Sequence, residues 1–235
     1  MIPKVIHYCW FGGNPLPESA KKCINSWKKF LPDYEIKEWN ESNFDVNSIA
    51  YTRDAYAAKK YAFVSDYARF VVLEREGGLY FDTDVEVIKP MDDIVKKGAF
   101  FGIEVDGDEK NSKMPAVAPG LCLGAEAHMP FYVQICKGFE ALNFYTEDGK
   151  LNPFTMIPMV TKMLVDLGMQ AHNRVQEVGV FTLYPAEYFN PLESTTGRLK
   201  VTENTRSIHW YMASWLPKQP LWLKKLKQLY HRIRK

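Results

Sequence analysis

Apolar and polar positions alternate with two different periods along the first half of the chain, and the change of period predicts a series of strands and helices. Residues 4–10 are β-branched and aromatic and run into the turn sequence GGNP, which is typical of a strand that ends in a loop. Residues 18–30 place apolar side chains at helical spacing, and residues 34–39 alternate again. The chain is therefore expected to open with a β-α-β unit.

The same patterns continue through the rest of the chain. Residues 51–76 have an apolar helical face that stops at Gly77-Gly78, and residues 79–88 follow as a strand. Further strands are expected at 99–104, 179–184 and 207–210, and further helices at 130–142 and 153–167. Alternating strands and helices predict an α/β fold with a mainly parallel central sheet.

Length and composition fit one such domain. The chain has 235 residues, of which 46% are hydrophobic and 25% charged, and this predicts a globular α/β domain over residues 1–215. Neither a long apolar run nor a signal-peptide pattern is present in the sequence, so a cytoplasmic location is expected. The four scattered cysteines are expected to be unpaired, buried or half-buried thiols.

Residues 216–235 form a basic segment of different character. From Lys218 onward there are seven Lys or Arg and no acidic residue, which leaves 23 basic against 28 acidic residues elsewhere, a net charge of about −5. Apolar residues recur at helical spacing within this segment, so it is expected to form a basic amphipathic helix. Such a helix either lies on the inner face of an anionic membrane or packs on its own domain; nucleic acid is not expected as a partner.

Two pairs of charged residues carry the candidate chemistry. Asp66 and Arg69 lie three positions apart in the expected helix, so they project from one face and can contact sugar hydroxyls. Asp82 and Asp84 lie two apart in a strand context, where both carboxylates can converge on a hard cation such as Mg²⁺ or Mn²⁺. A bare Asp-x-Asp is weak on its own, because two acids at the end of a strand are more often solvated.

The motifs around these acids resemble those of the DXD-containing sugar transferases, a family that includes outer-chain mannosyltransferases, bacterial capsule transferases and the catalytic domains of clostridial glucosylating toxins. The resemblance covers the chain from Ile2 to about Trp215. Four motifs in the expected order carry it: IPKVIHYCW at 2–10, the Ser65-Asp66-x-x-Arg69 helix, Gly77-Gly78-x-Tyr80-x-Asp82-x-Asp84, and His209-x4-Ser214-Trp215.

The resemblance implies a GT-A type single Rossmann-like domain and a role for each motif. Trp10 is expected to stack on the base of a nucleotide sugar, with a core tryptophan as the alternative. Asp66 and Arg69 are expected to contact the donor's sugar and ribose, with a surface salt bridge as the alternative. Asp84 is expected to bind the metal directly, and Asp82 to assist it; Tyr80 belongs to the same donor site.

The late motif is expected to complete the site. His209 is a candidate metal ligand, although a phosphate donor or a buried core histidine are alternatives, and Ser214 and Trp215 are expected to donate hydrogen bonds to the departing diphosphate. The segment 119–125 occupies the place where the family lines its sugar pocket with an Asn that is not evident here, which leaves the donor sugar open.

Together these expectations describe a retaining, metal-dependent hexosyltransferase. It would use Mn²⁺ or Mg²⁺ to move a hexose from a nucleotide-diphosphate sugar, with a UDP-sugar favoured, to a glycan or lipid-linked acceptor. Two alternatives remain. FDTDV at 81–85 resembles the nucleophile loop of haloacid-dehalogenase phosphohydrolases, although that loop normally follows the first strand. The chain could also bind nucleotide sugars at a membrane without catalysis.

Overall fold

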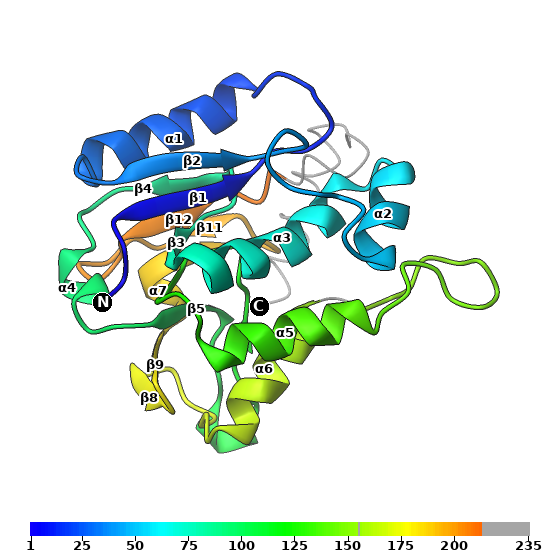
Figure 1. Ribbon diagram of the computed structural model, residues 1–235. Coiled ribbons are helices and arrows are strands. Elements are labelled where there is room, and N and C mark those ends of the chain that lie inside the picture. The colour runs from blue at the N-terminus through cyan, green and yellow to red at the C-terminus, as the bar shows by residue number, and fades with distance from the viewer. Residues whose placement is uncertain (155, 213–235) are drawn as a thin grey trace.

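The computed structural model describes residues 1–154 and 156–212 and gives them an α/β fold (Figure 1). The helices are α1 (Glu18–Phe30), α2 (Ala50–Ala57), α3 (Tyr61–Glu76), α4 (Asp92–Val95), α5 (Pro130–Glu140), α6 (Met156–Asp166) and α7 (Ala186–Phe189), with a 3-10 turn η1 at Glu109–Asn111. The strands are β1 (Val5–Cys9), β2 (Glu35–Trp39), β3 (Gly78–Tyr80), β4 (Val85–Val87), β5 (Phe100–Val105), β6 (Ala116–Val117), β7 (Leu123–Ala125), β8 (Gln176–Val178), β9 (Phe181–Tyr184), β10 (Leu192–Glu193), β11 (Arg198–Leu199) and β12 (Ser207–His209).

The central sheet is mixed, so the expectation of a mainly parallel sheet is wrong. Its strand order is β2-β1-β3-β7-β5-β9-β8, with β6 paired to β5. The pairs β1-β2, β1-β3 and β5-β9 are parallel, whereas β7 is antiparallel to both β3 and β5, and β8 is antiparallel to β9. The chain reaches β7 from β5 without a crossover helix, and a connection of that kind favours the antiparallel direction.

Helices cover both faces of this sheet, and each face has its own core. Helix α1 packs on one face, and α2, α3 and α5 lie on the other (Figure 1). Neighbouring strand residues point to opposite faces: Leu79 and Phe100 belong to the α1-side core, whereas Tyr80 and Phe101 belong to the α3-side core. Both cores are rich in fully buried aromatic side chains, which bury large apolar areas and hold the sheet between the two helical layers.

Two elements that the pattern predicted as continuous are interrupted. The helix expected over 51–76 is divided into α2 and α3 by Lys59, whose φ of 57° is left-handed and ends the first helix. The strand expected over 79–88 is divided into β3 and β4 by a turn at residues 82–84, closed by the bond from the Val85 amide to the Asp82 carbonyl at 3.0 Å. The predicted helix end at Gly77 is confirmed, with a φ of 65° there.

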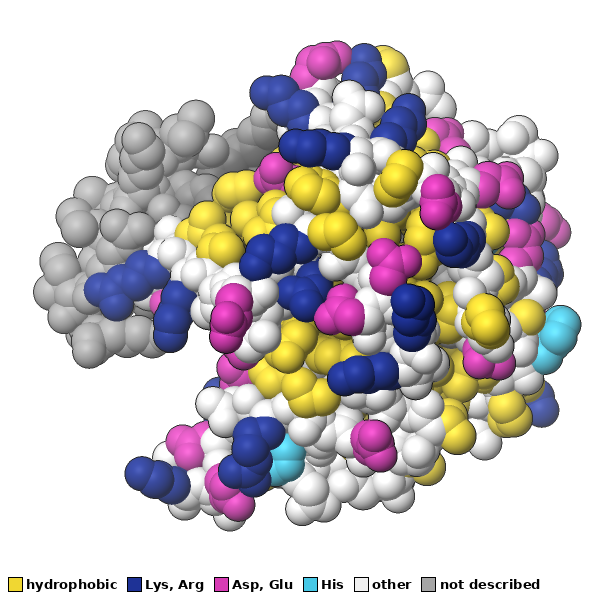
Figure 2. Space-filling model, turned by 90° about the vertical axis from the view of Figure 1, so that its left-hand side faces the viewer, with side chains coloured by type: hydrophobic (Ala, Val, Ile, Leu, Met, Phe, Trp, Pro, Cys, Tyr) yellow, Lys and Arg dark blue, Asp and Glu magenta, His cyan; other side chains and the backbone are white. Residues whose placement is uncertain are grey.

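The surface charges, the helix lengths and the cysteines place few constraints on function. On the face seen in Figure 2, acidic and basic side chains are interspersed. Within residues 1–154 and 156–212, no helix is both long and apolar enough to cross a bilayer. The four cysteines are free thiols, and three of them are buried, as expected. The basic segment 216–235 lies outside the described residues.

Candidate functional site

The turn that contains Asp82 and Asp84 is fixed to the two strands beside it. The Phe81 amide donates to the His7 carbonyl of β1 at 3.1 Å, and the Asp82 amide donates to the Gly120 carbonyl at 3.0 Å. Because β1, β3 and β5 all point the same way, the turn lies at the edge where their carboxyl ends meet. In open α/β sheets this edge is where ligands bind.

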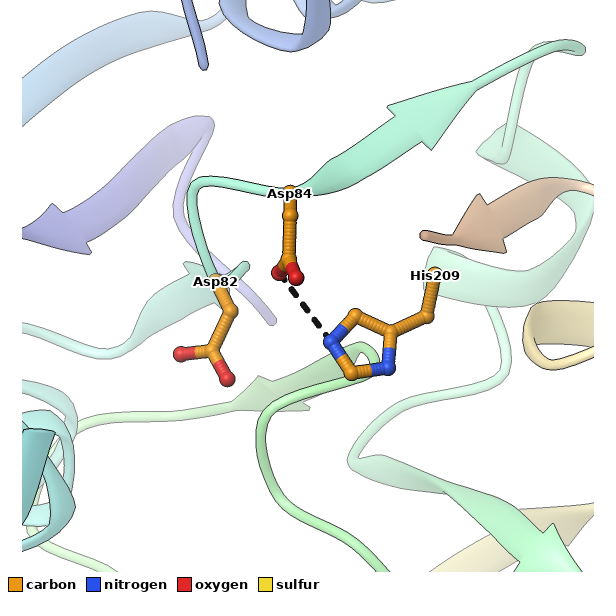
Figure 3. A group of neighbouring side chains, drawn as sticks. All are labelled: Asp82, Asp84 and His209. Atoms are coloured by element: carbon orange, nitrogen blue, oxygen red, sulfur yellow. Dashed lines mark ion pairs between the residues drawn. The ribbon is translucent and has the colours of Figure 1, made fainter. Parts of the chain in front are cut away.

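His209 reaches this turn through an antiparallel pairing between distant parts of the chain. Strand β12 pairs with β4 so that His209 lies opposite Val85, and the His209 imidazole Nε2 lies 3.0 Å from Asp84 Oδ1 (Figure 3). One ligand atom from each of Asp82, Asp84 and His209 lies within 4.8 Å of the others. We call these three residues the acid-histidine group.

Backbone and side-chain donors hold Asp84 as a carboxylate. The Met212 amide donates to Asp84 Oδ2 at 2.8 Å, and the Trp210 amide donates to the Asp84 carbonyl at 3.0 Å. Burial alone would raise the pKa of Asp84, but the His209 and Met212 donors outweigh it and hold that pKa below its ordinary value. Burial likewise opposes the charge of His209, yet the bond to Asp84 raises its pKa above the ordinary value.

The donor set of this group fits a divalent cation. Two carboxylates and an imidazole are a combination that suits Mn²⁺, because carboxylates prefer hard cations and an imidazole prefers softer ones than Mg²⁺. The Nδ1 atom of His209 is buried and has no hydrogen-bond partner among the described residues. The group is therefore a candidate metal site built from two chain segments that the sequence analysis had named.

Asp82 is shared between the acid-histidine group and a buried cation. Arg69 extends from α3 and is only 3% exposed; its Nη2 lies 2.7 Å from Asp66 Oδ1 and its Nη1 lies 3.4 Å from Asp82 Oδ1. The Tyr80 hydroxyl donates to Asp82 Oδ1 at 3.0 Å, and the Tyr80 ring centroid lies 4.8 Å from the guanidinium carbon. Asp66 and Arg69 thus form an ion pair, but a buried one rather than the surface pair considered as the alternative.

The charges of two half-buried carboxylates compensate the buried cation of Arg69. Burial raises the pKa of Asp66 to about 6, against the opposing charge of Arg69. Burial disfavours the charge of Arg69, yet Asp82 and Asp66 together raise its pKa above the ordinary value. Arg69 therefore stays cationic, and its Nη1 has no hydrogen-bond partner in the described part of the chain. A buried donor that lies 3.4 Å from one carboxylate but makes no hydrogen bond favours a polar or anionic ligand here.

The structure brings six of the named residues together and places Trp10 apart from them. Asp66, Arg69, Tyr80, Asp82, Asp84 and His209 form one connected set. Trp10 follows β1 at the same sheet edge, but its half-buried ring packs against the α1-side core, and its indole N–H donates to the Asn14 carbonyl at 2.6 Å. Ser214 and Trp215 lie outside the described residues.

Sequence reasoning missed several residues that shape the site. A Cβ on Gly120 would lie 2.0 Å from Asp82 Oδ2, so this residue leaves the space that the carboxylate occupies. The Tyr211 ring centroid lies 4.3 Å from that of His209, and the Tyr211 hydroxyl donates to Glu104 Oε1 at 3.1 Å. Gly120 belongs to the segment 119–125, which the family resemblance assigned to the sugar pocket. No pattern in the sequence distinguished Tyr211 or Glu104.

Comparisons with known proteins match parts of this chain to glycosyltransferases. Residues 17–101 match the model of the glycosyltransferase sugar-binding region containing DXD motif. An uncharacterised glycosyltransferase of Acanthamoeba polyphaga mimivirus is 30% identical over 110 residues, which are 43% of this chain and 43% of that protein. Inositol phosphoceramide mannosyltransferase 1 of Schizosaccharomyces pombe is 29% identical over 106 residues, 42% of this chain and 33% of that protein.

The chain spans less than half the length of these two relatives in the aligned stretches. Among solved structures, a glycosyltransferase involved in the glycosylation of the major capsid of PBCV-1 has a TM-score of 0.48 and 11% identity, covering 98% of this chain and 100% of that one. The matched residues 17–101 contain Asp66, Arg69, Asp82 and Asp84. Through these residues part of the chain is similar to the glycosyltransferase sugar-binding regions that contain a DXD motif.

Proposed function

We propose that the chain is a retaining, metal-dependent hexosyltransferase that uses a nucleoside diphosphate sugar as its donor. The observation that carries this proposal is the acid-histidine group, whose ligand atoms lie within 4.8 Å of one another next to the buried pair of Asp66 and Arg69. A divalent cation held by Asp82, Asp84 and His209 would neutralise negative charge on a diphosphate leaving group. The retaining outcome and the GT-A type of fold follow from the family resemblance.

The protein's own residues have distinct tasks in this proposal. Arg69 Nη1 has an ion-pair contact to Asp82 but no hydrogen bond among the described residues, so it can donate to an oxygen of the donor, while Asp66 keeps the guanidinium oriented through their 2.7 Å contact. Tyr80 and Gly120 fix Asp82 from two sides, one by a hydrogen bond and the other by leaving space. Such positioning lowers the barrier because groups aimed at developing charge need no reorganisation during the reaction.

The base and sugar of the donor belong to the proposal as well. The family resemblance favours a uridine nucleotide, whereas one relative carries the name of a mannosyltransferase, which makes a mannosyl donor the second candidate. The proposed acceptor is a glycan or a lipid-linked saccharide, with residues 1–215 as the catalytic domain and 216–235 as a tail that contacts anionic lipid.

A donor-hydrolysis screen tests the proposal. UDP-Glc, UDP-Gal, UDP-GlcNAc and GDP-Man are incubated with the protein and Mn²⁺, and release of the nucleoside diphosphate is measured. We expect release from at least one donor, and a loss of about 100-fold in Asp84→Ala, the size typical of removing a group that stabilises developing charge. Asp166→Ala is the matched control, because it removes a carboxylate from an exposed ion pair on α6. Near wild-type release in Asp84→Ala would contradict the proposal.

Two further assays separate this function from its alternatives. A phosphohydrolase would release phosphate from p-nitrophenyl phosphate, and we expect no such release, because Asp82 is engaged by Tyr80 and Arg69. A protein that binds nucleotide sugars without catalysis would show a thermal shift with donor and Mn²⁺ but no hydrolysis. Release of the nucleoside diphosphate therefore distinguishes a transferase from a protein that only binds the donor.

A further inference from the structure

A cleft of about 530 Å³ with polar and apolar walls opens beside the acid-histidine group. Four segments form its walls: the carboxyl end of β5 with Glu104 and Asp106, the start of α7 at Ala186, the stretch from Asn190 into the β10-β11 turn, and Tyr211 after β12. The cleft lies at the same sheet edge as Asp82, because β5 runs parallel to β3. Of the site residues described in the preceding subsections, only Tyr211 and Glu104 line the cleft.

The chemistry of the walls selects for a neutral ligand that is rich in hydroxyl groups. Carboxylates of Glu104 and Asp106 and hydroxyls of Ser194, Thr195 and Tyr211 line the cleft, and none of its described lining residues is Lys or Arg. A diphosphate would meet these carboxylates without a compensating cation, so the nucleotide is excluded from this space. A saccharide presents O–H donors to carboxylate oxygens and pairs well with such a lining.

One buried side-chain oxygen in the wall has no hydrogen-bond partner among the described residues. Asn190 is 9% exposed, and its Nδ2 donates to the Glu104 carbonyl at 3.0 Å and to the Tyr211 hydroxyl at 2.7 Å. Its Oδ1 is buried and has no hydrogen-bond partner within the described residues. Because unpaired buried acceptors are costly, a donor supplied by a ligand hydroxyl would satisfy this oxygen.

The cleft and the cation of Arg69 flank the acid-histidine group on different sides. Arg69 and Tyr80 contact Asp82, whereas the Tyr211 ring lies 4.3 Å from the His209 ring and its hydroxyl donates to Glu104. A ligand in the cleft is therefore separated from Arg69 by the three candidate metal ligands. This arrangement would bring two substrates to the group from opposite directions.

We propose that this cleft binds the acceptor, a neutral saccharide whose hydroxyl groups pair with Glu104, Asn190 and Tyr211. The assignment rests on the proposed transferase function, because only a second substrate needs a place beside the donor. Tyr211 has a left-handed backbone with φ of 49°, and its hydroxyl bridges Asn190 and Glu104. It thus holds two of the three ligand-binding groups in place.

Ligand-observed NMR on the full chain tests this assignment directly. The probes are methyl α-D-mannopyranoside, methyl α-D-glucopyranoside and methyl α-D-galactopyranoside, each with Mn²⁺ and UDP or GDP. Saturation transfer is compared between the wild type, Ser194→Trp, Tyr211→Phe and the control Arg198→Trp. Ser194 is an exposed residue of the cleft wall, whereas Arg198 is an exposed residue of β11 outside it. A melting temperature for each variant shows that it is folded.

We expect at least one glycoside to bind the wild type and Arg198→Trp, and its affinity to fall about tenfold or more in Ser194→Trp, where the indole obstructs the cleft. Tyr211→Phe is expected to weaken binding several-fold, and it carries the test alone if Ser194→Trp does not fold. Absence of saturation transfer with all three glycosides overturns the assignment, as does equal binding by Ser194→Trp and Arg198→Trp.

The same samples test the cleft assignment and the proposed function independently of each other. UDP and GDP are titrated with Mn²⁺ into the wild type and into Asp84→Ala without any saccharide. Glycoside binding without nucleotide binding would contradict the transferase proposal while supporting the cleft assignment. Nucleotide binding without glycoside binding would contradict the cleft assignment alone.

Discussion

Gly120 and Asp82 lie so close together that a Cβ on residue 120 would be 2.0 Å from Asp82 Oδ2 and 3.0 Å from Arg69 Nη1. The main chain of Gly120 also accepts the hydrogen bond of the Asp82 amide at 3.0 Å. One residue therefore fixes the backbone of the DXD turn and leaves room for its first carboxylate. This contact links β7 and the loop before it to the chemistry of the site.

Gly120→Ala is expected to displace the Asp82 carboxylate and to lower donor hydrolysis about tenfold or more, because small misplacements of reacting groups are costly. Steady-state release of nucleoside diphosphate measures the effect. Gly138→Ala is the control: its Cβ would meet only the flexible Met159 side chain, at 3.1 Å from Sδ. Equal activity in the two variants would contradict the role given to Gly120.

Arg69→Leu is expected to lower the free energy of unfolding by about 3 kcal/mol, the low end of the range for breaking a buried ion pair, because the half-buried carboxylates of Asp66 and Asp82 lose their buried cation. Urea denaturation measures the change. The double variant with Asp66→Asn should recover part of the loss, since one of the two stranded charges is then removed. A loss below 1 kcal/mol, the size typical of exposed pairs, would show that these charges are solvated.

His209→Ala is expected to remove most of the thermal stabilisation that Mn²⁺ and a nucleoside diphosphate give together. A ligand present at 100 times its dissociation constant stabilises the folded state by about 2.7 kcal/mol, so the wild type should show a clear shift of its melting temperature. His128→Ala is the control, because His128 is largely exposed and pairs with Glu74. An unchanged shift in His209→Ala would exclude the imidazole from metal binding.

Protonation of His7 is expected to weaken the fold as the pH falls. The Trp39 indole donates to His7 Nδ1 at 3.0 Å, and His7 Nε2 lies 2.9 Å from the Gly77 carbonyl, so the ring is neutral with its proton on Nε2. Burial lowers the pKa of His7 below its ordinary value of 6.5. Above pH 6.5 both folded and unfolded states are neutral; below it the unfolded chain takes up the proton first, and stability is lost.

Denaturation curves at pH 7.5 and 5.5 check whether the free energy of unfolding falls as the pH is lowered. The wild type should lose more stability over that interval than His7→Gln, although His7→Gln is less stable at pH 7.5 by about 1–2 kcal/mol from the lost hydrogen bond. His128→Gln should follow the wild type at both values. A steeper loss in His7→Gln than in the wild type would contradict the assignment of a neutral ring.

Removal of residues 218–235 is expected to abolish binding to anionic vesicles. This segment carries seven basic and no acidic residues, and each cation near an anionic surface contributes about 1 kcal/mol. Flotation with vesicles of phosphatidylserine and phosphatidylcholine measures the difference, and pure phosphatidylcholine vesicles are the control. Equal flotation of both proteins would contradict a membrane role for the segment.

The local chemistry of the site could be predicted from the sequence because it depends on short motifs. Asp66 and Arg69 lie one helical turn apart, and that spacing alone brings their charges together. Gly77 ends α3 as predicted, because a left-handed residue is needed there. The strand break at residues 82–84 was not predicted, since β3 and β4 are both apolar and the turn between them has no Gly or Pro.

Long-range relations could not be predicted in the same way. The direction of β7 depends on how the chain returns from β5, and because both faces of this sheet are covered, its antiparallel strands are as continuously apolar as its parallel ones. Tyr211 and Glu104 lie far apart in sequence, and only the placement of β12 beside β4 brings the Tyr211 hydroxyl to the carboxylate. Sequence reasoning therefore identified the acids and the imidazole but not the cleft beside them.

The pairing of β12 with β4 also sets the order in which the site can assemble during synthesis. A nascent chain that has emerged only as far as residue 101 already contains both aspartates of the turn, yet the histidine that completes the trio is more than a hundred residues away. Newly made protein would therefore carry only part of the candidate metal site until its late strand pairs with β4. If the complete group holds a cation, the two carboxylates of the early turn would hold it less tightly than all three ligands together.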